Sequence, residues 1–370
     1  MSNFDLASLA LKSAFPTNSI ITDDKGLPSV MVFIPKFKMS DVITGGSDST
    51  HPAFIVNGVE KNGIYISKYQ NKVYDGRAYS LPGEDPTCAI NFDNAAARCS
   101  AKGEGWHLMT AMEWGAIALW CKKNGWLPYG NNNYGKDARE TAYKAIPTLI
   151  GSDGKTNRVA TGTGPVEWSH NKQLDGIYDL NGNVSEWVGG FRLVKGEVQI
   201  LENNDAADSS NSQSATSAQW KAIDGTTGEL IDPDGNGTTE NSIKLDMVSS
   251  KWQYVTGAIS NQVDDYRSAT FASMTCADTV CAEAKEILIA LAMLPDDSAF
   301  DYQGDYFYAN NGAAERTPCR GGGWGNGSFA GVFCAHLSYA RSYAGVFCTS
   351  LGNARSLTYT RIGFRSAFYA

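Results

Sequence analysis

Apolar and polar residues follow patterns along the chain that predict several short strands and helices. The β-branched and aromatic runs at 29–36 and 64–69 are typical of strands, because turn-forming residues flank each of them. The pattern over 5–14 predicts a short amphipathic helix that ends before Pro16. We interpret this helix as a docking segment, with oligomerisation as the alternative.

Two further helices are predicted in the first half of the chain. The Ala-rich stretch 91–102 is followed by Gly103, a residue that commonly terminates a helix. Thr110 and Glu113 have the spacing of a capping box and open a helix that extends to about residue 124. Four apolar residues are expected on one face of this helix: Trp114, Ile117, Ala118 and Cys121.

The composition changes near residue 203 and divides the chain into four parts. We expect an N-terminal segment of helix and strand (1–50), two parts of one core (51–202 and 301–370), and an insertion (203–300). The insertion begins with a polar run of low bulk, which predicts a surface loop or a partly disordered segment. A strand pair and a helix near 282–293 are predicted further along it.

The sequence DPDGNG at 232–237 resembles the start of a calcium-binding loop. A calcium loop of that kind needs a glutamate at its twelfth position, and Ile243 stands there. A hairpin turn between the two predicted strands of the insertion is therefore the preferred interpretation.

Charge and composition exclude some classes of function. The 370-residue chain has a net charge of −8 and a pI near 5.1, whereas proteins that bind the nucleic-acid backbone carry a basic field. No stretch approaches the roughly 20 apolar residues of a membrane span, and the N-terminus lacks the pattern of a signal peptide. The eight cysteines form no CxxC pair, so zinc binding is not indicated, and we expect them to be mostly reduced.

The last 46 residues, 325–370, differ in composition from everything before them. They contain no Asp, Glu, Lys, Gln, Met, Trp or Pro, although these seven types supply 95 of the preceding 324 residues. The segment is nevertheless varied, since it includes aromatic, aliphatic, hydroxyl, thiol and guanidinium side chains. Low complexity alone therefore does not explain the composition.

This segment includes a tandem repeat, FAGVFCAHLSYARS at 329–342 and YAGVFCTSLGNARS at 343–356, with nine of fourteen positions identical. All five differing pairs can be interconverted by changes at the adenines of an asparagine codon, and such changes never yield Trp, Lys, Glu, Gln or Met. The residue types thus point to adenine-directed mutagenesis of the coding region. Five positions differ between the copies: Phe329/Tyr343, Ala335/Thr349, His336/Ser350, Ser338/Gly352 and Tyr339/Asn353.

Several motifs outside the repeat resemble a known family, the variable proteins of diversity-generating retroelements. Those proteins present a variable C-terminal region on a C-type-lectin fold of the formylglycine-generating-enzyme (sulfatase-modifying-factor) type. The resemblance covers about 51–190 and 319–367, and the motifs are specific in combination rather than singly. They are IYISKYQN (64–71), WHLMTAMEWGAIA (106–118), GPVEWSHN (164–171), DLNGNVSEW (179–187), RGGGW (320–324) and IGFR (362–365).

The resemblance implies a loop-rich α+β fold, with a variable region over about 325–361 that binds a protein or a glycan on a cell surface. Its carriers are often phage tail-tip receptor binders or displayed bacterial proteins, and the absence of a signal peptide favours a virion. No cofactor, nucleic-acid partner or membrane insertion is expected, and homo-oligomer formation is left open. The candidate ligand-binding residues are Phe329, Cys334, His336, Ser338, Tyr339, Tyr343, Cys348, Ser350, Gly352, Asn353, Leu357, Tyr359 and Arg361.

Packing supports the division into fixed and varied positions. Substitutions that range from Gly to Tyr would disrupt a core, so the varied side chains are expected to form one exposed, contiguous face. Tyr and Phe would supply rigid contact area there, as in antibody paratopes. The residues expected to be buried are Ala330, Val332, Phe333, Ala340 and Phe364, with Trp324 as a large core contact and the ARS motif as a turn anchor.

An enzyme of the same fold is the alternative. Formylglycine-generating oxidases use a close pair of reactive cysteines, whereas Cys334 and Cys348 are one repeat unit apart. Related iron enzymes need a histidine-rich site, and the four histidines have no ligand spacing. We therefore predict no enzymatic activity and no metal site. Five residues that could be mistaken for a catalytic cluster are interpreted as structural braces: Glu167, Trp168, Asn183, Glu186 and Trp187.

Overall fold

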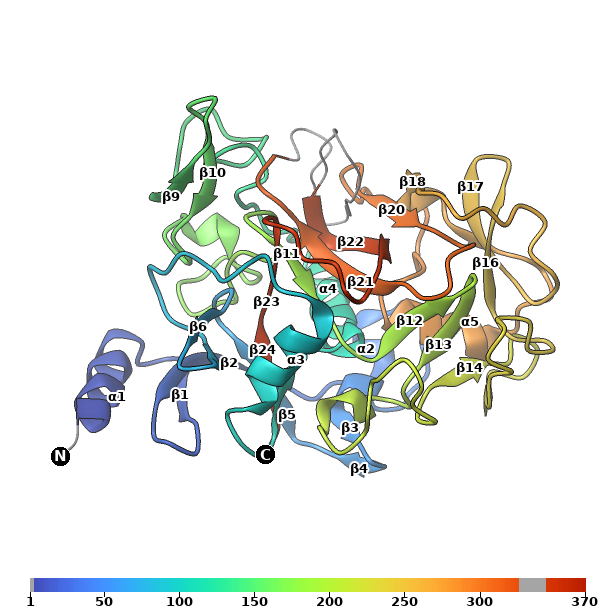
Figure 1. Cartoon of the computed structure of the whole chain (residues 1–370), viewed down its shortest axis with the longest axis horizontal. Coiled ribbons are helices and arrows are strands. Elements are labelled where there is room, and N and C mark those ends of the chain that lie inside the picture. The colour runs from blue at the N-terminus through green and yellow to red at the C-terminus, as the bar shows by residue number, and fades with distance from the viewer. Residues whose placement is uncertain (1–2, 326–343) are drawn as a thin grey trace.

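The computed structural model describes residues 3–325 and 344–370, and the side chains of residues 5–325 and 349–370. The fold is α+β, with short helices set among several β-sheets and long loops (Figure 1). The α-helices are α1 (Asn3–Ala14), α2 (Met39–Val42), α3 (Phe92–Ser100), α4 (Ala111–Lys123) and α5 (Ala282–Ala290). Single 3₁₀ turns are η1 (Pro52–Phe54), η2 (Val166–Trp168), η3 (Asp205–Ala207) and η4 (Phe271–Ser273).

A five-stranded sheet joins the N-terminal segment to the C-terminus. Its order is β1-β2-β5-β24-β8, so the last strand of the chain pairs between strands of the first third. The predicted strands at 29–36 and 64–69 correspond to β2 and β5. The bounds are β1 (Ser19–Thr22), β2 (Pro28–Pro35), β5 (Gly63–Ser67), β8 (Trp106–Leu108) and β24 (Ser366–Phe368).

A six-stranded sheet of order β18-β20-β22-β21-β11-β23 contains the second copy of the repeat. Strand β23 is followed by Arg365 and then by β24, so the chain passes from this sheet to the five-stranded one at that arginine. The bounds are β11 (Ser185–Trp187), β18 (Arg267–Thr270), β20 (Tyr306–Ala309), β21 (Thr317–Gly322), β22 (Ala344–Asn353) and β23 (Ile362–Phe364).

A seven-stranded sheet contains most strands of segment 203–300. Its path is β15-β14-β13-β16-β17-β19, and β12 also pairs with β13. The segment thus extends a hairpin, β12–β13, that precedes it in the sequence. The bounds are β12 (Phe191–Val194), β13 (Glu197–Ile200), β14 (Lys221–Ile223), β15 (Leu230–Ile231), β16 (Lys244–Val248), β17 (Lys251–Val255) and β19 (Thr275–Cys276).

The predicted hairpin around 232–237 is wrong in its pairing. Strand β15 pairs with β14, and β16 pairs with β13 and β17, so the strands on the two sides of the loop are not neighbours. The loop is instead organised by Asp234, whose carboxylate accepts hydrogen bonds from the backbone N–H groups of Asn236 and Thr238. Three small hairpins complete the fold: β3 (Ile55–Val56) with β4 (Val59–Glu60), β6 (Lys72–Tyr74) with β7 (Arg77–Tyr79), and β9 (Pro147–Ile150) with β10 (Thr156–Val159).

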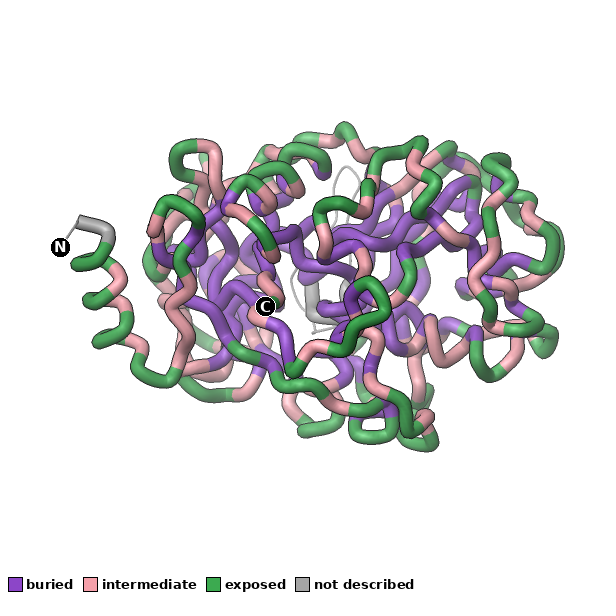
Figure 2. The backbone as a smooth tube through the Cα atoms, turned by 90° about the horizontal axis from the view of Figure 1, so that it is seen from below, coloured by how far each residue is buried: buried purple, intermediate pink, exposed green. Residues whose placement is uncertain are grey.

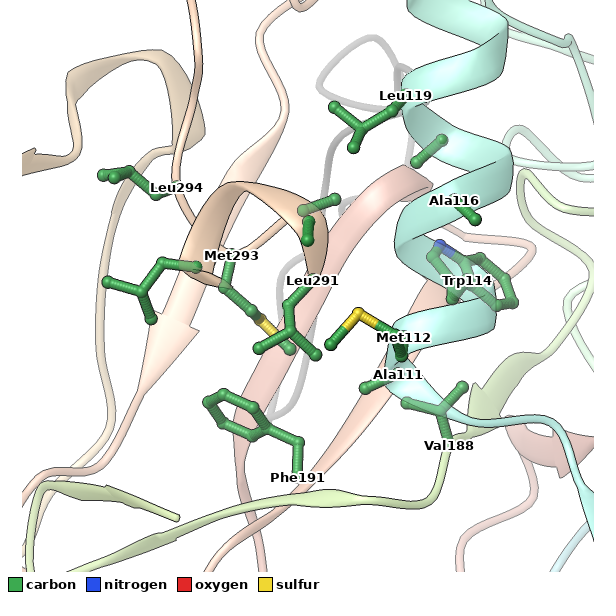
Figure 3. Close-up of a cluster of buried hydrophobic side chains, with 14 of the residues drawn as sticks. Ala111, Met112, Trp114, Ala116, Leu119, Val188, Phe191, Leu291, Met293 and Leu294 are labelled. Atoms are coloured by element: carbon green, nitrogen blue, oxygen red, sulfur yellow. The ribbon is translucent and has the colours of Figure 1, made fainter. Parts of the chain in front are cut away.

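Helix α4 lies at the centre of the largest hydrophobic cluster. The four residues expected on one face, Trp114, Ile117, Ala118 and Cys121, are all buried in it, and burial extends round the helix to every residue from Ala111 to Leu119. The helix packs against the segment after α5, which contributes Leu291 and Met293, and against Phe191 of β12 (Figure 3). Buried backbone runs through the middle of the molecule, whereas α1 and the peripheral loops are exposed (Figure 2).

The predicted capping box at the start of α4 is confirmed. Thr110 Oγ1 accepts the Glu113 N–H at 3.0 Å, and Glu113 Oε2 accepts the Thr110 N–H at 2.9 Å. Asn204 adds to this cap, since Thr110 Oγ1 donates to its Oδ1 and its Nδ2 donates to Glu113 Oε1. The predicted surface loop is confirmed for residues 208–219, which are exposed or partly exposed and form no helix or strand. It is wrong for the first residues of the run, because Asn204, Ala206 and Ala207 are buried where they close the N-terminus of the central helix.

Candidate ligand-binding surface

Strand β22 carries much of the second repeat copy into the centre of the six-stranded sheet. It pairs in parallel with β20 and antiparallel with β21. Because side chains alternate along a strand, its residues divide between two sides. Leu351 is fully buried in the main hydrophobic cluster, and Thr349 contacts Arg320 on that side. Ser350 lies on the other side, opposite Tyr308 of β20.

Three tyrosines outside the repeat lie on the Ser350 side of the sheet, and we call them the tyrosine stack: Tyr266, Tyr306 and Tyr308. The rings of Tyr266 and Tyr308 have centroids 5.1 Å apart and planes inclined by 21°, and those of Tyr306 and Tyr308 are 5.8 Å apart at 28°. Tyr266 also covers Gly352, where an added Cβ would lie 2.4 Å from its ring. Tyr308 is buried at 3% exposure, so the partly exposed rings of Tyr266 and Tyr306 supply the rigid, amphipathic contact area of the stack.

The tyrosine stack was not predicted from the sequence. Tyr306 and Tyr308 are two residues apart, a spacing that places both on one side of any strand. This spacing is the signal in the sequence that indicates these two tyrosines. Tyr266 precedes β18 in the insertion, and only the pairing of β18 with β20 brings it beside the repeat, so no local pattern could have identified it.

Six predicted binding residues have described side chains, and their exposure varies. Tyr359 is exposed, whereas Gly352, Leu357 and Arg361 are partly buried. The expected exposure of Ser350 and Asn353 is wrong, since both are 1% exposed. Ser350 lies between β20 and β21, and Asn353 pairs with Thr317 of β21, so the sheet itself encloses them. The others lie outside the described side chains: Phe329, Cys334, His336, Ser338, Tyr339, Tyr343 and Cys348.

The expected anchoring of the ARS motif holds for its arginine. Arg355 donates to both oxygens of Glu315, at 3.1 and 3.3 Å, to Asp93 Oδ1 at 2.6 Å and to the Gln213 carbonyl at 2.7 Å. Its guanidinium also lies over the Phe92 ring. The neighbouring Ala354 and Ser356 are exposed, so the other two residues of the motif are not buried anchors.

The expected burial of Phe364 and Trp324 is confirmed, at 0% and 3% exposure. Two cations lie near the Trp324 indole, since the guanidinium carbons of Arg361 and Arg158 are 5.0 and 5.9 Å from the ring centroid. The predicted variable residue Arg361 therefore packs on Trp324 next to Gly325, the last described residue before the repeat. The other residues expected to be buried, Ala330, Val332, Phe333 and Ala340, lie outside the described part.

The motifs quoted for the family meet in one buried polar centre. Arg365 of IGFR forms a two-point ion pair with Glu186 of LNGNVSEW, at 2.5 and 2.6 Å, and both are fully buried. Gln70 of IYISKYQN donates to Glu186 Oε1 and accepts from Asn183 Nδ2. Fully paired buried charges of this kind fix the relative position of loops and strands.

Four of the five residues interpreted as braces have structural partners. Asn183 and Glu186 belong to the polar centre, and the indole N–H groups of Trp168 and Trp187 donate to Glu140 Oε2 and to the Ile90 carbonyl. Glu167 is partly exposed, and its carbonyl accepts the Tyr129 N–H.

Asp179 lies beside the polar centre and is only partly satisfied. Its Oδ2 accepts the Gly162 N–H at 3.0 Å, whereas its buried Oδ1 has no hydrogen-bond partner in the described structure. Burial raises the pKa of Asp179 to about 6. The backbone φ of 61° is one that Asp and Asn tolerate better than most residues.

Within residues 3–325 and 344–370, no group of three or more His, Cys, Asp or Glu side chains has the arrangement of a metal site. His107 is a structural residue, since its Nε2 lies 2.8 Å from Glu113 Oε1 and its Nδ1 lies 2.9 Å from the Gly105 carbonyl. Six cysteines are described as free thiols: Cys88, Cys99, Cys121, Cys276, Cys281 and Cys319. In the same ranges, no helix is both long and apolar enough to traverse a bilayer.

Comparison with known proteins places the chain in a family. No curated protein sequence matches it. Among solved structures, PvdO from Pseudomonas aeruginosa is similar, with 13% identity and a TM-score of 0.37 over 95% of this chain and 98% of that one. The model of the sulfatase-modifying factor enzyme 1-like domain matches residues 16–227, more than half of the chain. The chain therefore belongs to the sulfatase-modifying factor enzyme 1-like family.

Proposed function

We propose that this protein is a ligand-binding protein whose C-terminal region is diversified by adenine-directed mutagenesis. One observation carries the proposal. Leu351 and Arg355, which are identical in both repeat copies, are anchors of the fold, whereas the varied Ser350 and Gly352 lie on the side of the tyrosine stack. A side chain on the tyrosine side of β22 can therefore be replaced without disturbing the packing of the main hydrophobic cluster.

The position of Gly352 suggests how variation under the tyrosines would act. A larger side chain at Gly352 would meet the ring of Tyr266, a half-buried residue, rather than backbone or core. Its substitution would therefore tilt or displace the ring and change the shape of the surface. Variation at exposed Tyr359 would change the contacting side chain directly. The division is not strict, because Thr349 also differs between copies and faces the core.

The ligand in this proposal is a protein or glycan on a cell surface, and the carrier is a phage tail tip or a displayed protein. Aromatic residues and arginine provide most of the binding energy in many interfaces. Both types are present at the surface, as Tyr266 and Tyr306 of the tyrosine stack, Tyr359 and Arg361. The acidic net charge of −8 does not favour nucleic acid as the ligand.

The decisive experiment is to sequence the locus that encodes the protein. We expect a near-copy of the 325–361 coding region beside a reverse transcriptase gene, with asparagine codons in that copy at the varied positions. Resequencing a passaged population should then show changes confined to the adenines of those codons. A locus without a second copy, or changes spread over all four bases, would contradict the proposal.

Family membership favours one alternative, an oxidase of the sulfatase-modifying type. In that case Cys334 and Cys348 would have to act as a pair, although they are fourteen residues apart in equivalent positions of the repeat. Substituting each cysteine by serine distinguishes the two functions. Ligand binding at a diversified surface tolerates the change, whereas oxidase chemistry at cysteine is abolished by it.

A further inference from the structure

A hollow of about 670 Å³ lies apart from the repeat. Its walls come from the residues before β1, from β2, from α2, from the C-terminal end of α4 and from the loop at 170–175. No residue of β20, β21 or β22 lines it. Polar and aromatic residues of the lining include Asn18, Trp120, His170, Asn171 and Asp175.

His170 presents a hydrogen-bond donor in this hollow. Its Nδ1 lies 2.9 Å from the Ile177 backbone nitrogen, which can only donate, so Nδ1 is unprotonated and the proton of the neutral ring is on Nε2. Burial lowers the pKa of His170 to about 4, so the ring is neutral at pH 7. The side chain is 4% exposed and lines the hollow, and its Nε2–H has no protein hydrogen-bond partner in the described structure. The Nε2 atom is not one of the fully buried unpartnered atoms, so it faces the hollow, where a ligand hydroxyl can take the place of water.

Trp120 supplies a flat apolar wall beside this donor. Its ring centroid is 5.1 Å from that of His170, with the planes inclined by 44°. The indole is only partly buried although it belongs to the buried central helix, because it lies at the C-terminal end of α4 where the hollow begins. Phe37 and Phe33 add further aromatic surface.

The acceptors of the hollow are held in place by a hydrogen-bond network. Asn171 Nδ2 donates to Asp175 Oδ1 at 2.9 Å, and Asn18 Nδ2 donates to the Asp175 carbonyl at 2.7 Å. Buried Lys68 in turn donates to Asn18 Oδ1 at 2.6 Å. These contacts fix the Asp175 carboxylate and leave its Oδ2 without a protein donor in the described structure. Because the groups are already ordered, a ligand would bind with a smaller entropic cost.

We propose that this hollow binds a sugar ring. A sugar hydroxyl both accepts and donates, so it can accept from His170 Nε2–H and donate to Asp175, while the apolar face of the ring packs on Trp120. An apolar ligand would leave both polar groups unpaired. The lining has two basic residues, Lys36 and Lys123, and two acidic residues, Asp41 and Asp175, so its net charge is close to zero. The hollow therefore does not favour a strongly charged ligand of either sign. The site is separate from the diversified surface and does not depend on it.

The test uses saturation-transfer NMR on the full chain with four probes: glucose, galactose, mannose and N-acetylglucosamine. We expect at least one sugar to receive magnetisation from the wild-type protein. Its binding should saturate as the sugar concentration is raised, which gives the dissociation constant. His170→Asn retains an acceptor for the Ile177 N–H but removes the Nε2–H donor, and it should weaken binding about tenfold or more. Trp120→Leu should do the same through loss of the aromatic wall.

The control is Tyr359→Ser, which alters the diversified surface and should leave sugar binding unchanged. Circular dichroism shows whether each variant is folded. If His170→Asn does not fold, Trp120→Leu decides the test, because Trp120 is only partly buried and its replacement should be tolerated. The proposal is overturned by the absence of transfer to all four sugars, or by transfer that persists unchanged in the folded variants. Loss of binding in Tyr359→Ser would equally refute it, because binding would then belong to the diversified surface.

Discussion

Arg355 and Glu315 are joined by two hydrogen bonds, and this pair holds the turn after β22 against the loop before β21. Glu315 also accepts from Arg192 Nη1 at 2.9 Å, so one carboxylate fixes two arginines. Burial would raise the pKa of Glu315, but the two guanidinium groups outweigh it and hold the pKa below its ordinary value. The pair links a residue that is identical in both repeat copies to the framework that presents the varied positions.

Replacement of Arg355 by methionine should destabilise the protein by about 2 kcal/mol. The value is below the 3–5 kcal/mol of a fully buried pair, because Glu315 keeps Arg192 and both side chains retain some exposure. Urea denaturation measures the free energy of unfolding. The matched control is Lys36→Met, which breaks the exposed pair with Glu60 and should cost less than about 0.5 kcal/mol. Equal costs for the two variants would show that Arg355 is no anchor.

Asp179→Asn should stabilise the protein at neutral pH and not at acidic pH. The pKa of Asp179 is about 6 in the folded protein against 3.8 ordinarily. Protonated Asp179 therefore costs no stability below pH 3.8, and its ionisation destabilises the folded protein progressively as the pH rises through 6. Two pKa units correspond to about 3 kcal/mol. Asparagine carries no charge and tolerates the same φ. The gain in stability of Asp179→Asn over the wild type should therefore be complete above pH 6 and absent near pH 3.5.

Melting temperatures at pH 3.5, 5, 6 and 8 test this dependence. The control variant is Asp153→Asn at an exposed loop, where no pH-dependent gain is expected. A gain for Asp179→Asn that does not change with pH would mean that Asp179 is neutral in the folded protein throughout this range.

Local patterns predicted much of the scaffold. The helices with explicit start and stop signals, such as α4 with Thr110 and Glu113, were found because their caps depend on nearby residues. The all-round burial of α4 was missed, since a helix enclosed by Phe191 and Leu291 receives those contacts from distant parts of the chain. The pairing of β15 with β14 was missed for the same reason.

The candidate surface was predicted less completely than the scaffold. Identity between repeat copies correctly indicated a structural role for Arg355 of the ARS motif. Leu351 is also identical in both copies and is fully buried, although its burial was not predicted. It could not show that Ser350 and Asn353 are enclosed, because burial at those positions comes from β20 and β21. Tyr266 and the hollow around His170 were likewise beyond reach, because each is assembled from segments that only the fold brings together.

The protein should show no oxidase activity on cysteine-containing peptides and should bind no transition metal tightly. The reasons are the separation of Cys334 from Cys348 and the sparse histidines. Oxygen consumption with a cysteine peptide, together with metal analysis of the purified protein, measures both properties. Stoichiometric copper or iron with turnover would overturn this prediction and support the oxidase.

Simultaneous replacement of Phe329, His336, Tyr339, Tyr343 and Tyr359 by serine should leave the melting temperature nearly unchanged. Surface substitutions typically cost within about 0.5 kcal/mol each. Binding to a true ligand should be lost, because aromatic anchors carry most interface energy. Trp324→Ala alone should cost roughly 3–5 kcal/mol, as for a large buried residue. Thermal unfolding that affects the five-fold variant more than Trp324→Ala would show that the varied residues belong to the core.

Adjacent positions on β22 give the sharpest test of the division between fixed and varied residues. Leu351→Ser removes a fully buried side chain and places a hydroxyl in the hydrophobic cluster, so it should cost about 3–5 kcal/mol. Gly352→Ser introduces the residue that the first copy has at the equivalent Ser338, and the ring it meets belongs to half-buried Tyr266. We expect that substitution to cost less than about 1 kcal/mol, since the ring can move without disturbing the core. Urea denaturation measures the free energy of unfolding of the two single variants. A smaller loss of stability for Leu351→Ser than for Gly352→Ser would contradict the proposal that the side of β22 facing the tyrosines is diversified.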